Sequence, residues 1–367
     1  IILTTPEFLV FHLDKFKQIA AKIGLFVVDE AHHLARSKRQ GYYLLGQSWR
    51  QLGKPLAFAV TATADQDTAQ LIKNILCCSQ VVVENYVRHN LQIVDKRAEK
   101  DKLKYLLKLL DTGERIVIYV NSRKQAYQLA NDLRFYYPAS REEIGFYHGG
   151  LNSQQRLFLE EAFRKGNLRV MVTTSAFGEG IDIPDIQHIV LYHLCFSLTE
   201  FNQLSGRAGR NHQAAKIHLL FNQQDRQLNE LILQGSAPTR AVLAKFYLQL
   251  RKKAKRNNPF MYTKRELQKE MQKLGMRNIG VQTVSACLAV LEDLELLRLE
   301  GEGSRNYLYL LPSPPEKLDL ADSLCYVEGR DEWDEFQSFA DFALKKEKEE
   351  ILLAINRPIV PHEIMSM

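Results

Sequence analysis

The chain has 367 residues, of which 46% are hydrophobic and 25% charged, so it holds enough apolar material for two or three globular domains and shows no signature of disorder. Its longest apolar runs, such as Ile189–Leu194, fall well short of the roughly 20 residues that a membrane-spanning helix needs. The five cysteines form neither a disulfide framework nor a CxxC zinc pattern, which predicts a reduced, cytoplasmic setting.

The net charge of +6 is unevenly distributed along the chain. Residues 239–277 hold 12 Lys or Arg against 2 Asp or Glu, whereas residues 278–367 hold 8 against 18. The basic block predicts a polyanionic partner, and the acidic end is a candidate surface for a protein partner. The chain begins at Ile1, within an apolar segment and without a targeting peptide, so we expect it to be part of a longer protein.

The first 222 residues alternate short apolar runs with longer amphipathic stretches. The expected strands are Leu25–Val28, Leu56–Val60, Val81–Val83, Ile116–Val120, Ile144–Tyr147, Val170–Thr173, Ile189–Tyr192 and Ile217–Phe221. The expected helices between them include Lys102–Leu110, Ser122–Phe135 and Ser153–Lys165. This alternation predicts an α/β fold with a buried, mostly parallel sheet and helices on both faces. The polar segment Asn85–Lys100 predicts a boundary, with domains over residues 1–85 and 86–222.

The strand pattern ends after Phe221, and basic helical stretches predict a linker over residues 223–258. A capping box at Thr263 and Glu266 then begins one amphipathic helix, and apolar spacings of three and four predict a second over residues 281–291. A hairpin around residues 301–303 completes a winged-helix-like domain over residues 259–312. An acidic helical tail is expected over residues 313–367.

Two neighbouring carboxylates, Asp29 and Glu30, follow the first apolar strand. Open α/β sheets place their ligands at the carboxyl ends of their strands. In nucleotide hydrolysis one carboxylate can hold Mg²⁺ through water while its neighbour polarises the attacking water. The same pair also suits a helix N-terminus, where the helix dipole favours acids, so the pair alone leaves both interpretations open.

Three later segments add residue types that phosphate chemistry uses. They are Thr61 and Thr63 after the next strand, Gly178 and Gly180 after a later one, and the pair Arg207 and Arg210. The hydroxyl groups can relay a change at a phosphate by hydrogen bonds, and the glycines let the backbone approach a phosphate closely. The arginines, three residues apart, can stabilise charge on a transferring phosphoryl group, although a surface arginine pair is most often only solvated. Each segment alone is a weak indication of phosphate chemistry, and the indication becomes strong when all of them occur in this order along the chain.

This ordered set resembles the superfamily 2 helicases, and within them the RecQ family, over about residues 1–222. The matching segments are Thr4–Glu7 for motif Ib, Asp29–His32 for motif II, Thr61–Thr63 for motif III, Ile118–Arg123 for motif IV, Tyr147–Leu151 with Arg156 for the stretch before motif V, Ala176–Asp182 for motif V and Gln203–Arg210 for motif VI. Motifs V and VI are the most specific, because AFGEGID and QLSGRAGR are close to the RecQ wording.

The resemblance implies RecA-like parallel-sheet helicase lobes, the first one partial, that use ATP and Mg²⁺ to unwind DNA in the 3′ to 5′ direction, in recombination and repair on nucleoid-associated DNA. It implies that Asp29 holds Mg²⁺ with Glu30 beside it as general base, and that Arg207 and Arg210 reach the γ-phosphate. Coupling between nucleotide and DNA is implied for His32, Thr61, Thr63, Gly178, Gly180, Asp182 and Gln203. Contacts to single-stranded and junction DNA are implied for Thr5, Arg123, His148 and Arg156.

The chain departs from the RecQ pattern at several points. It contains no G-x-x-x-x-G-K-[ST] phosphate loop, so these residues alone are not expected to hydrolyse ATP. The segment His33–Tyr43 replaces a longer aromatic-rich loop, which puts the coupling of DNA binding to hydrolysis in question. The four-cysteine module that commonly follows motif VI is absent, so no zinc is expected. The histidines at 188, 193, 212 and 218 fit strand ends and surface positions rather than a metal site.

The winged-helix-like domain has two interpretations, a DNA-binding module or a protein-docking domain, and the preceding basic block favours DNA. Lys252, Lys253, Lys255 and Arg256 are expected to track phosphates, which gives a salt-sensitive affinity that does not depend on sequence. Arg305 and Tyr307 on the hairpin are candidates to wedge at a duplex end, although alternating tyrosines also suit an ordinary strand.

Three alternative functions stay open. The acidic tail resembles the C-terminal end of some RecJ-type exonucleases, so the chain could be the helicase-like part of an exonuclease fusion. It could also be a non-catalytic DNA-binding module, although such a module has no chemical need for Glu30 and both motif VI arginines. An RNA helicase of the same superfamily is the third alternative.

Overall fold

The computed structural model describes residues 1–356, except for short gaps at 37–39, 62–63, 65, 84–86, 179–182, 184–185, 277–278, 303–304, 315 and 317. The chain forms two compact units. The first contains residues 1–221 and 345–367, and the second contains residues 222–344. Among the described residues, no helix has both the length and the apolar character to cross a membrane.

The N-terminal segment of the first unit is built on two parallel strands, β1 (Leu25–Val28) and β2 (Leu56–Ala59). Its helical elements are α1 (Pro6–Phe11), α2 (Leu13–Lys17), η1 (Ala20–Lys22), α3 (His33–Arg36), α4 (Gln40–Gln51) and α5 (Gln66–Leu76). Trp49 and Leu76 are buried in the core between helices and strands. The apolar side chains of Leu25, Val27 and Phe58 are each more than half exposed. Parallel sheets are normally covered on both faces, so this sheet presents an unusual amount of uncovered apolar surface.

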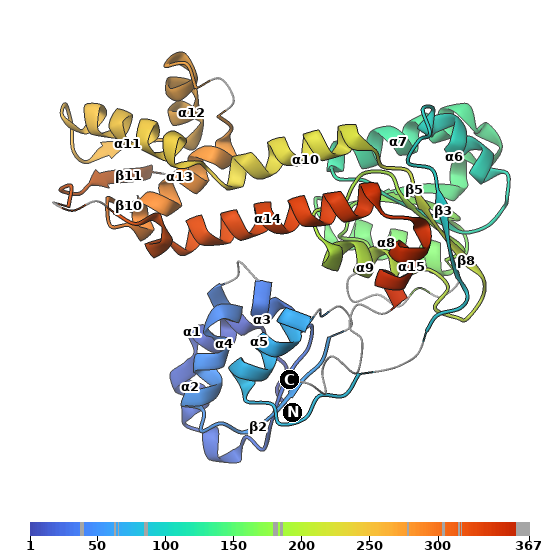
Figure 1. Ribbon diagram of the computed structural model, residues 1–367, viewed down its shortest axis with the longest axis horizontal. Helices are drawn as coiled ribbons and strands as arrows, with labels where there is room; N and C mark the ends of the chain where they lie inside the picture. The colour runs from blue at the N-terminus through green and yellow to red at the C-terminus, as the bar shows by residue number, and fades with distance from the viewer. Residues whose placement is uncertain are drawn as a thin grey trace. The chain divides into compact units, whose positions relative to one another are not determined.

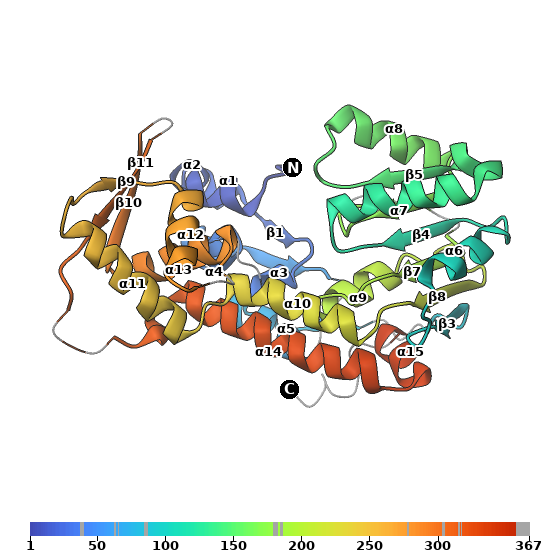
Figure 2. The same ribbon diagram turned by 90° about the horizontal axis from the view of Figure 1, so that it is seen from above.

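A six-stranded, all-parallel sheet forms the centre of the first unit, in the order β3-β8-β7-β4-β6-β5. Its strands are β3 (Leu91–Asp95), β4 (Ile116–Tyr119), β5 (Ile144–Tyr147), β6 (Val170–Thr173), β7 (His188–Leu191) and β8 (Ala215–Leu219). The surrounding helices are α6 (Lys102–Leu110), α7 (Arg123–Tyr136), η2 (Pro138–Glu143), α8 (Ser153–Arg164) and α9 (Leu198–Ser205) (Figures 1 and 2). This arrangement confirms the predicted α/β fold with a RecA-like parallel sheet.

Both faces of the six-stranded sheet are buried, because successive side chains of a strand point to opposite faces. On one face Ile116 and Ile118 pack with Leu129 and Leu133 of α7 and with residues of α6. On the other face Val117 is equally inaccessible. Apolar, β-branched runs are stable in a sheet only when helices cover both faces, as they do here.

One predicted strand is wrong. Val81–Val83 forms no strand, and Val82 is almost fully exposed. The edge strand is β3, inside the polar segment 85–100, where alternate residues Leu91 and Ile93 are buried against β8. Val81–Val83 has high strand propensity but no neighbouring strand to pair with, so it forms no strand. The less apolar segment Leu91–Asp95 forms one because it pairs with β8.

The second unit contains α10 (Gln223–Ser236), α11 (Arg240–Ala254), α12 (Lys264–Lys273) and α13 (Val281–Asp293). Strands β10 (Leu297–Glu302) and β11 (Arg305–Leu310) form the antiparallel hairpin, and β9 (Phe260–Met261) pairs with β11. The predicted capping box is present, since the Thr263 side chain accepts from the Glu266 amide and Glu266 from the Thr263 amide. Phe246, Leu267 and Leu308 lie in one buried core, so three helices and a three-stranded sheet form a winged-helix arrangement.

The residues after the hairpin divide between the two units. Short η3 (Leu320–Asp322) and long α14 (Leu324–Lys345) follow the hairpin, and α14 lies beside α10 in both views (Figures 1 and 2). Arg226 of α10 pairs with Asp341 of α14 at 2.6 Å, so part of the acidic charge of the tail is neutralised within the chain. The last described helix, α15 (Lys348–Asn356), packs against β3 and α9 of the first unit.

Candidate nucleotide and nucleic-acid site

The paired carboxylates lie directly after β1, at the carboxyl end of the strand. Asp29 and Glu30 are both exposed, and Asp29 Oδ1 accepts a hydrogen bond from the Glu30 amide at 2.9 Å. Glu30 has a φ of 50°, an uncommon conformation for a residue with a side chain, which turns the chain sharply here. Two exposed carboxylates side by side are hard oxygen ligands of the kind that Mg²⁺ binds, so this donor set fits the ion.

The His32 ring joins three of the predicted motifs. It is buried, and its Nδ1 lies 3.0 Å from the hydroxyl of Thr61 and 3.3 Å from Glu30 Oε2. Its Nε2 lies 3.1 Å from the amide nitrogen of Gln203, on α9. An amide nitrogen can only donate, so Nε2 accepts and Nδ1 carries the proton that is donated toward Thr61 or Glu30. One ring therefore links motifs II, III and VI.

The first motif VI arginine is held by the motif V glycine. Arg207 Nη1 donates to the carbonyl oxygen of Gly178. Gly178 has a φ of 94°, and a side chain there would place Cβ about 2.7 Å from Arg207 Cζ, so only glycine fits. Arg207 and Arg210 line the same small cavity, of about 10 Å³, which is closed by Phe177 and Ile186. The two arginines are therefore neighbours, as their spacing predicted.

The loop that carries these arginines is fixed by residues at the start of β3. The Arg88 guanidinium donates to the carbonyl of Gly206 at 2.8 Å and to that of Ala208. Asn90 donates through Nδ2 to the carbonyls of Gly209 (2.8 Å) and Gln213 (2.7 Å). Neither Arg88 nor Asn90 was predicted, because nothing in a polar Arg-His-Asn sequence indicates a contact 120 residues away.

Tyr119, at the end of β4, is a second residue that sequence reasoning missed. It is buried, and burial raises the pKa of its hydroxyl to about 12, although the positive charges of Arg207 and Arg210 act in the opposite direction. The hydroxyl donates to the carbonyl of Phe177 at 3.5 Å. Tyr119 therefore stays neutral beside the two arginines.

Two predicted DNA contacts lie together at the carboxyl ends of β4 and β5. A Cβ built on Gly150 would be 3.0 Å from Arg123 Nη1 and 3.3 Å from His148 Nδ1, so the two side chains flank this glycine. Arg123 is exposed at the first turn of α7. A cation and an imidazole beside exposed backbone suit contact with a phosphate.

Thr5 and Arg156 are more constrained than the prediction required. The Thr5 hydroxyl caps α1 by accepting from the Phe8 amide at 3.3 Å. Arg156 is half-buried beside Tyr147, whose hydroxyl donates to Glu160 at 2.6 Å. Burial, and then Glu160, raise the pKa of Tyr147 to about 12.

The basic residues of the second unit differ in how they are engaged. Lys252, Lys255 and Arg256 are exposed at the end of α11. Lys253 instead pairs with Glu270 at 2.7 Å and lies over the Phe260 ring. Tyr307 of β11 is half-buried opposite Glu300, and the Arg305 backbone pairs with Glu302. The Arg305 side chain, and the predicted site residues Thr63, Gly180 and Asp182, lie outside the part of the chain that the structure describes.

His188 is the first residue of β7, in line with the predicted strand end, but the predicted surface exposure of these histidines is mostly wrong. His188, His193 and His218 are all inaccessible, and only His212 is exposed. Among the described residues, no group of three His, Cys, Asp or Glu side chains is arranged to hold a metal ion.

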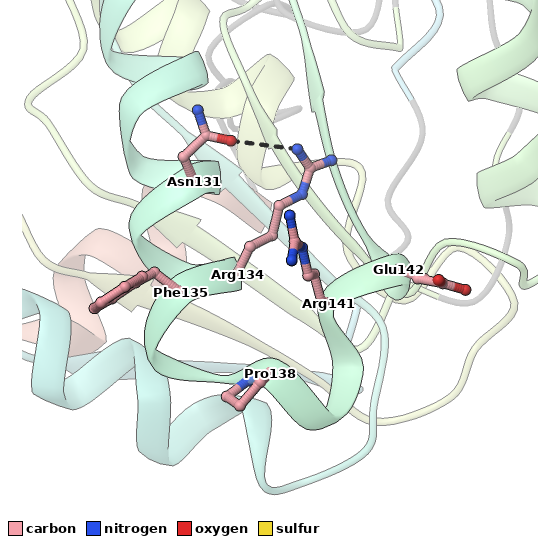
Figure 3. A pocket seen from close by; sticks show the side chains of 6 residues that line it. All are labelled: Asn131, Arg134, Phe135, Pro138, Arg141 and Glu142. Atoms are coloured by element: carbon pink, nitrogen blue, oxygen red, sulfur yellow. Dashed lines mark hydrogen bonds between the residues drawn. The ribbon is translucent and has the colours of Figure 1, made fainter.

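A hollow of about 540 Å³ is lined by residues of α7 and η2 (Figure 3). Arg134 and Arg141 line it, and Arg134 donates to the carbonyl of Ile144, the first residue of β5. Asp29, His148 and Gly178, by contrast, come after the ends of β1, β5 and β6. The hollow is therefore separate from the candidate site.

The six-stranded parallel sheet, with the glycine loop after β6 and the two arginines after α9 beside it, defines a RecA-like lobe. The helicase conserved C-terminal domain model matches residues 101–212. The probable ATP-dependent DNA helicase RecS of Bacillus subtilis is 32% identical over 253 residues, which cover 67% of this chain and 50% of the relative. The RecQ helicase of Synechocystis sp. is 34% identical over 248 residues, which cover 60% of this chain and 50% of the relative. The chain is therefore a member of the RecQ family of superfamily 2 helicases, as its motifs predicted.

Comparison with solved structures supports the fold of the chain. The helicase MrfA, in a crystal structure with DNA and AMPPNP, has a TM-score of 0.50 and 18% sequence identity, over 60% of this chain and 34% of that chain. At this identity the likeness concerns the fold alone. The chain spans about half the length of the curated relatives it matches.

Proposed function

We propose that the protein is an ATP-dependent DNA helicase of the RecQ type, which moves 3′ to 5′ on one strand and serves recombination and repair on nucleoid DNA in the cytoplasm. The names of the curated relatives support the activity. The observation that carries the proposal is the buried His32 ring, which contacts Thr61 at 3.0 Å and Gln203 at 3.1 Å. A ring bonded on both sides transmits a change at the carboxylates to the arginine-bearing segment.

The nucleotide chemistry follows from residue types that suit ATP and Mg²⁺. Asp29 would hold Mg²⁺, and Glu30 would take the proton of the attacking water. The ion supplies charge neutralisation at the phosphates when it is bound. Arg207 and Arg210 would stabilise the charge that develops on the transferring phosphoryl group. The phosphate-cradling loop that such hydrolysis needs is not among these 367 residues, and the exposed apolar face of β1 and β2 supports its supply by further polypeptide packed there.

DNA is the proposed partner of two surfaces. Arg123 and His148 offer a cation and a ring nitrogen at the carboxyl ends of the strands, where motif residues gather. Lys252, Lys255 and Arg256 offer exposed cations next to the winged-helix arrangement. Contacts of this kind neutralise phosphates without reading bases, so binding is expected to weaken steeply with salt.

The proposal is tested by unwinding of DNA duplexes that carry a 3′ or a 5′ tail, with ATP and Mg²⁺, alongside anisotropy measurements of single-strand binding. Glu30→Gln and Arg210→Ala should each reduce unwinding by at least about 100-fold while DNA affinity is kept. Glu142→Gln and Arg141→Ala are matched controls, because both residues line the separate hollow of α7 and η2 (Figure 3).

The outcomes separate the competing functions. Unwinding unchanged in Glu30→Gln would contradict the assigned roles. Tight binding with no ATP hydrolysis in the full-length protein, with a phosphate loop present, would indicate a non-catalytic DNA-binding module. Degradation of the single strand would indicate an exonuclease, and preferential unwinding of RNA duplexes would change the substrate class.

A further inference from the structure

The last described helix, α15, ends against the segment that carries the motif VI arginines. The Asn356 side-chain oxygen accepts from the backbone amide of Arg88 at 3.3 Å. The Ala354 carbonyl accepts from the side-chain amide of Asn202, on α9, also at 3.3 Å. Ile351, on the buried face of α15, is fully inaccessible. The helix is thus anchored by an apolar contact and two hydrogen bonds.

Arg88 forms hydrogen bonds through both its backbone amide and its guanidinium, and the two groups bind different partners. Its backbone amide is held by Asn356, at the end of α15. Its guanidinium donates to the carbonyls of Gly206 and Ala208, which flank Arg207 on either side. Arg88 therefore joins the tail to the arginine-bearing loop.

The loop over residues 206–211 depends on such outside support. It consists of turns, without helix or strand of its own, and Ala208 and Gly209 are buried. Buried carbonyl groups need partners, and here Arg88 and Asn90 provide them. The Gly209 amide likewise bonds outside the loop, to the Ile186 carbonyl at 3.0 Å. Loosening Arg88 would release two carbonyls that fix the direction in which the arginines point.

We propose that α15 is a positioning element for the motif VI arginines, acting through Asn356 and Arg88. This inference rests on the proposed function, because it assigns the arginines a role at the nucleotide. Asn356 and Arg88 are positioning residues and touch no reacting group. In this proposal α15 contributes to catalysis by the lobe, because it helps to fix the arginines in place.

Hydrogen exchange tests the structural half without any need for catalysis. Asn356→Ala should speed exchange of the backbone amides of residues 206–209 about fivefold, the effect of losing one ordinary hydrogen bond. Asn356→Asp retains an oxygen acceptor toward the Arg88 amide and should keep the wild-type rate. Leu353→Ala, on the exposed side of the same helix, is the matched control. Amides of β4 serve as the internal reference for the fold of the lobe.

Ile351→Ala is a second variant that loosens the anchor of α15 from its apolar side. Unchanged exchange at residues 206–209 in both Asn356→Ala and Ile351→Ala would overturn the inference. The functional half predicts a several-fold lower kcat for ATP hydrolysis in Asn356→Ala, rescue by Asn356→Asp, and little change in KM. If exchange responds but the full-length wild-type protein, with a phosphate loop present, hydrolyses no ATP, the proposed function fails and the positioning contact stands. If wild-type hydrolysis is normal and neither exchange nor kcat responds, the inference alone fails.

Discussion

A line of hydrogen-bonded polar groups, centred on the buried His188 and His218 of β7 and β8, makes the stability of the first unit sensitive to acid. Tyr105 OH lies 2.7 Å from His218 Nδ1, and His218 Nε2 lies 2.8 Å from His188 Nδ1. His188 Nε2 contacts the carboxylate of Glu114. If each group donates toward Glu114, every nitrogen is satisfied with both rings neutral, and an added proton on His218 would remove the acceptor of Tyr105.

Burial, and then the charge that His188 would carry, lower the pKa of His218 to about 3 from the ordinary 6.5. Burial also lowers the pKa of His188, although Glu114 opposes this. The unfolded chain takes up a proton as the pH falls through 6.5, whereas the folded chain does not until about pH 3. Stability is therefore complete above pH 6.5 and is lost progressively as the pH falls. At pH 5 the loss from His218 alone is about 2 kcal/mol, from about 1.36 kcal/mol per pKa unit over the 1.5 units below 6.5.

We predict that His218→Gln, which keeps hydrogen-bonding capacity but cannot titrate, removes this acid dependence. Urea titrations at pH 5 and pH 7 would be read through modification of Cys195 by 4,4′-dithiodipyridine and mass spectrometry, since Cys195 is buried just after β7 and reacts only when this region opens. The difference in unfolding free energy between wild type and variant should change by about 2 kcal/mol between the two pH values. His89→Gln, at an exposed histidine, is the control. Parallel pH profiles for wild type and His218→Gln would refute the reasoning.

Three further predictions concern other parts of the chain. Gly178→Ala should destabilise the first unit by about 1–3 kcal/mol in urea denaturation, because its Cβ would meet the Arg207 guanidinium at a positive φ. Phe246→Ala should cost the second unit about 3–5 kcal/mol by thermal or urea unfolding, since the ring is fully buried in the winged-helix core, and a small effect would contradict that packing. In DNA-binding measurements against salt, Lys252→Ala should lower the magnitude of the slope by about one, whereas Lys253→Ala should lower it less because Lys253 already pairs with Glu270.

The sheet was predictable from the sequence because its strands are nearly continuous apolar runs. Ile116–Val120 and Val170–Thr173 are buried on both faces, and such runs indicate a covered parallel sheet whatever their neighbours. The prediction failed where the signal depended on a partner strand. Val81–Val83 has the right composition but no strand beside it, and β3 is recognisable only once β8 is seen to pair with it.

The candidate site was predictable in its residue types but not in its supports. The Gly178 and Arg207 motifs are local patterns, and their proximity follows from the fold. Arg88 and Asn356 belong to no local pattern, and their contacts span more than a hundred residues. The same applies to His188 and His218, which looked like strand-end and surface residues until β7 and β8 were seen to be adjacent.

The arginine-bearing loop shows why supports of this kind matter for the proposed chemistry. Stabilising a charge that exists only during transfer requires donors already in place, because any reorganisation at that moment raises the barrier. Two guanidiniums on one turn repel each other, and their side chains stay in place only if the backbone of the turn is fixed. Here Gly178 holds one guanidinium directly, and Arg88 holds the carbonyls on both sides of it. Since Arg88 is itself held by Asn356, the last described residue of the chain bears on how well the arginines are preorganised.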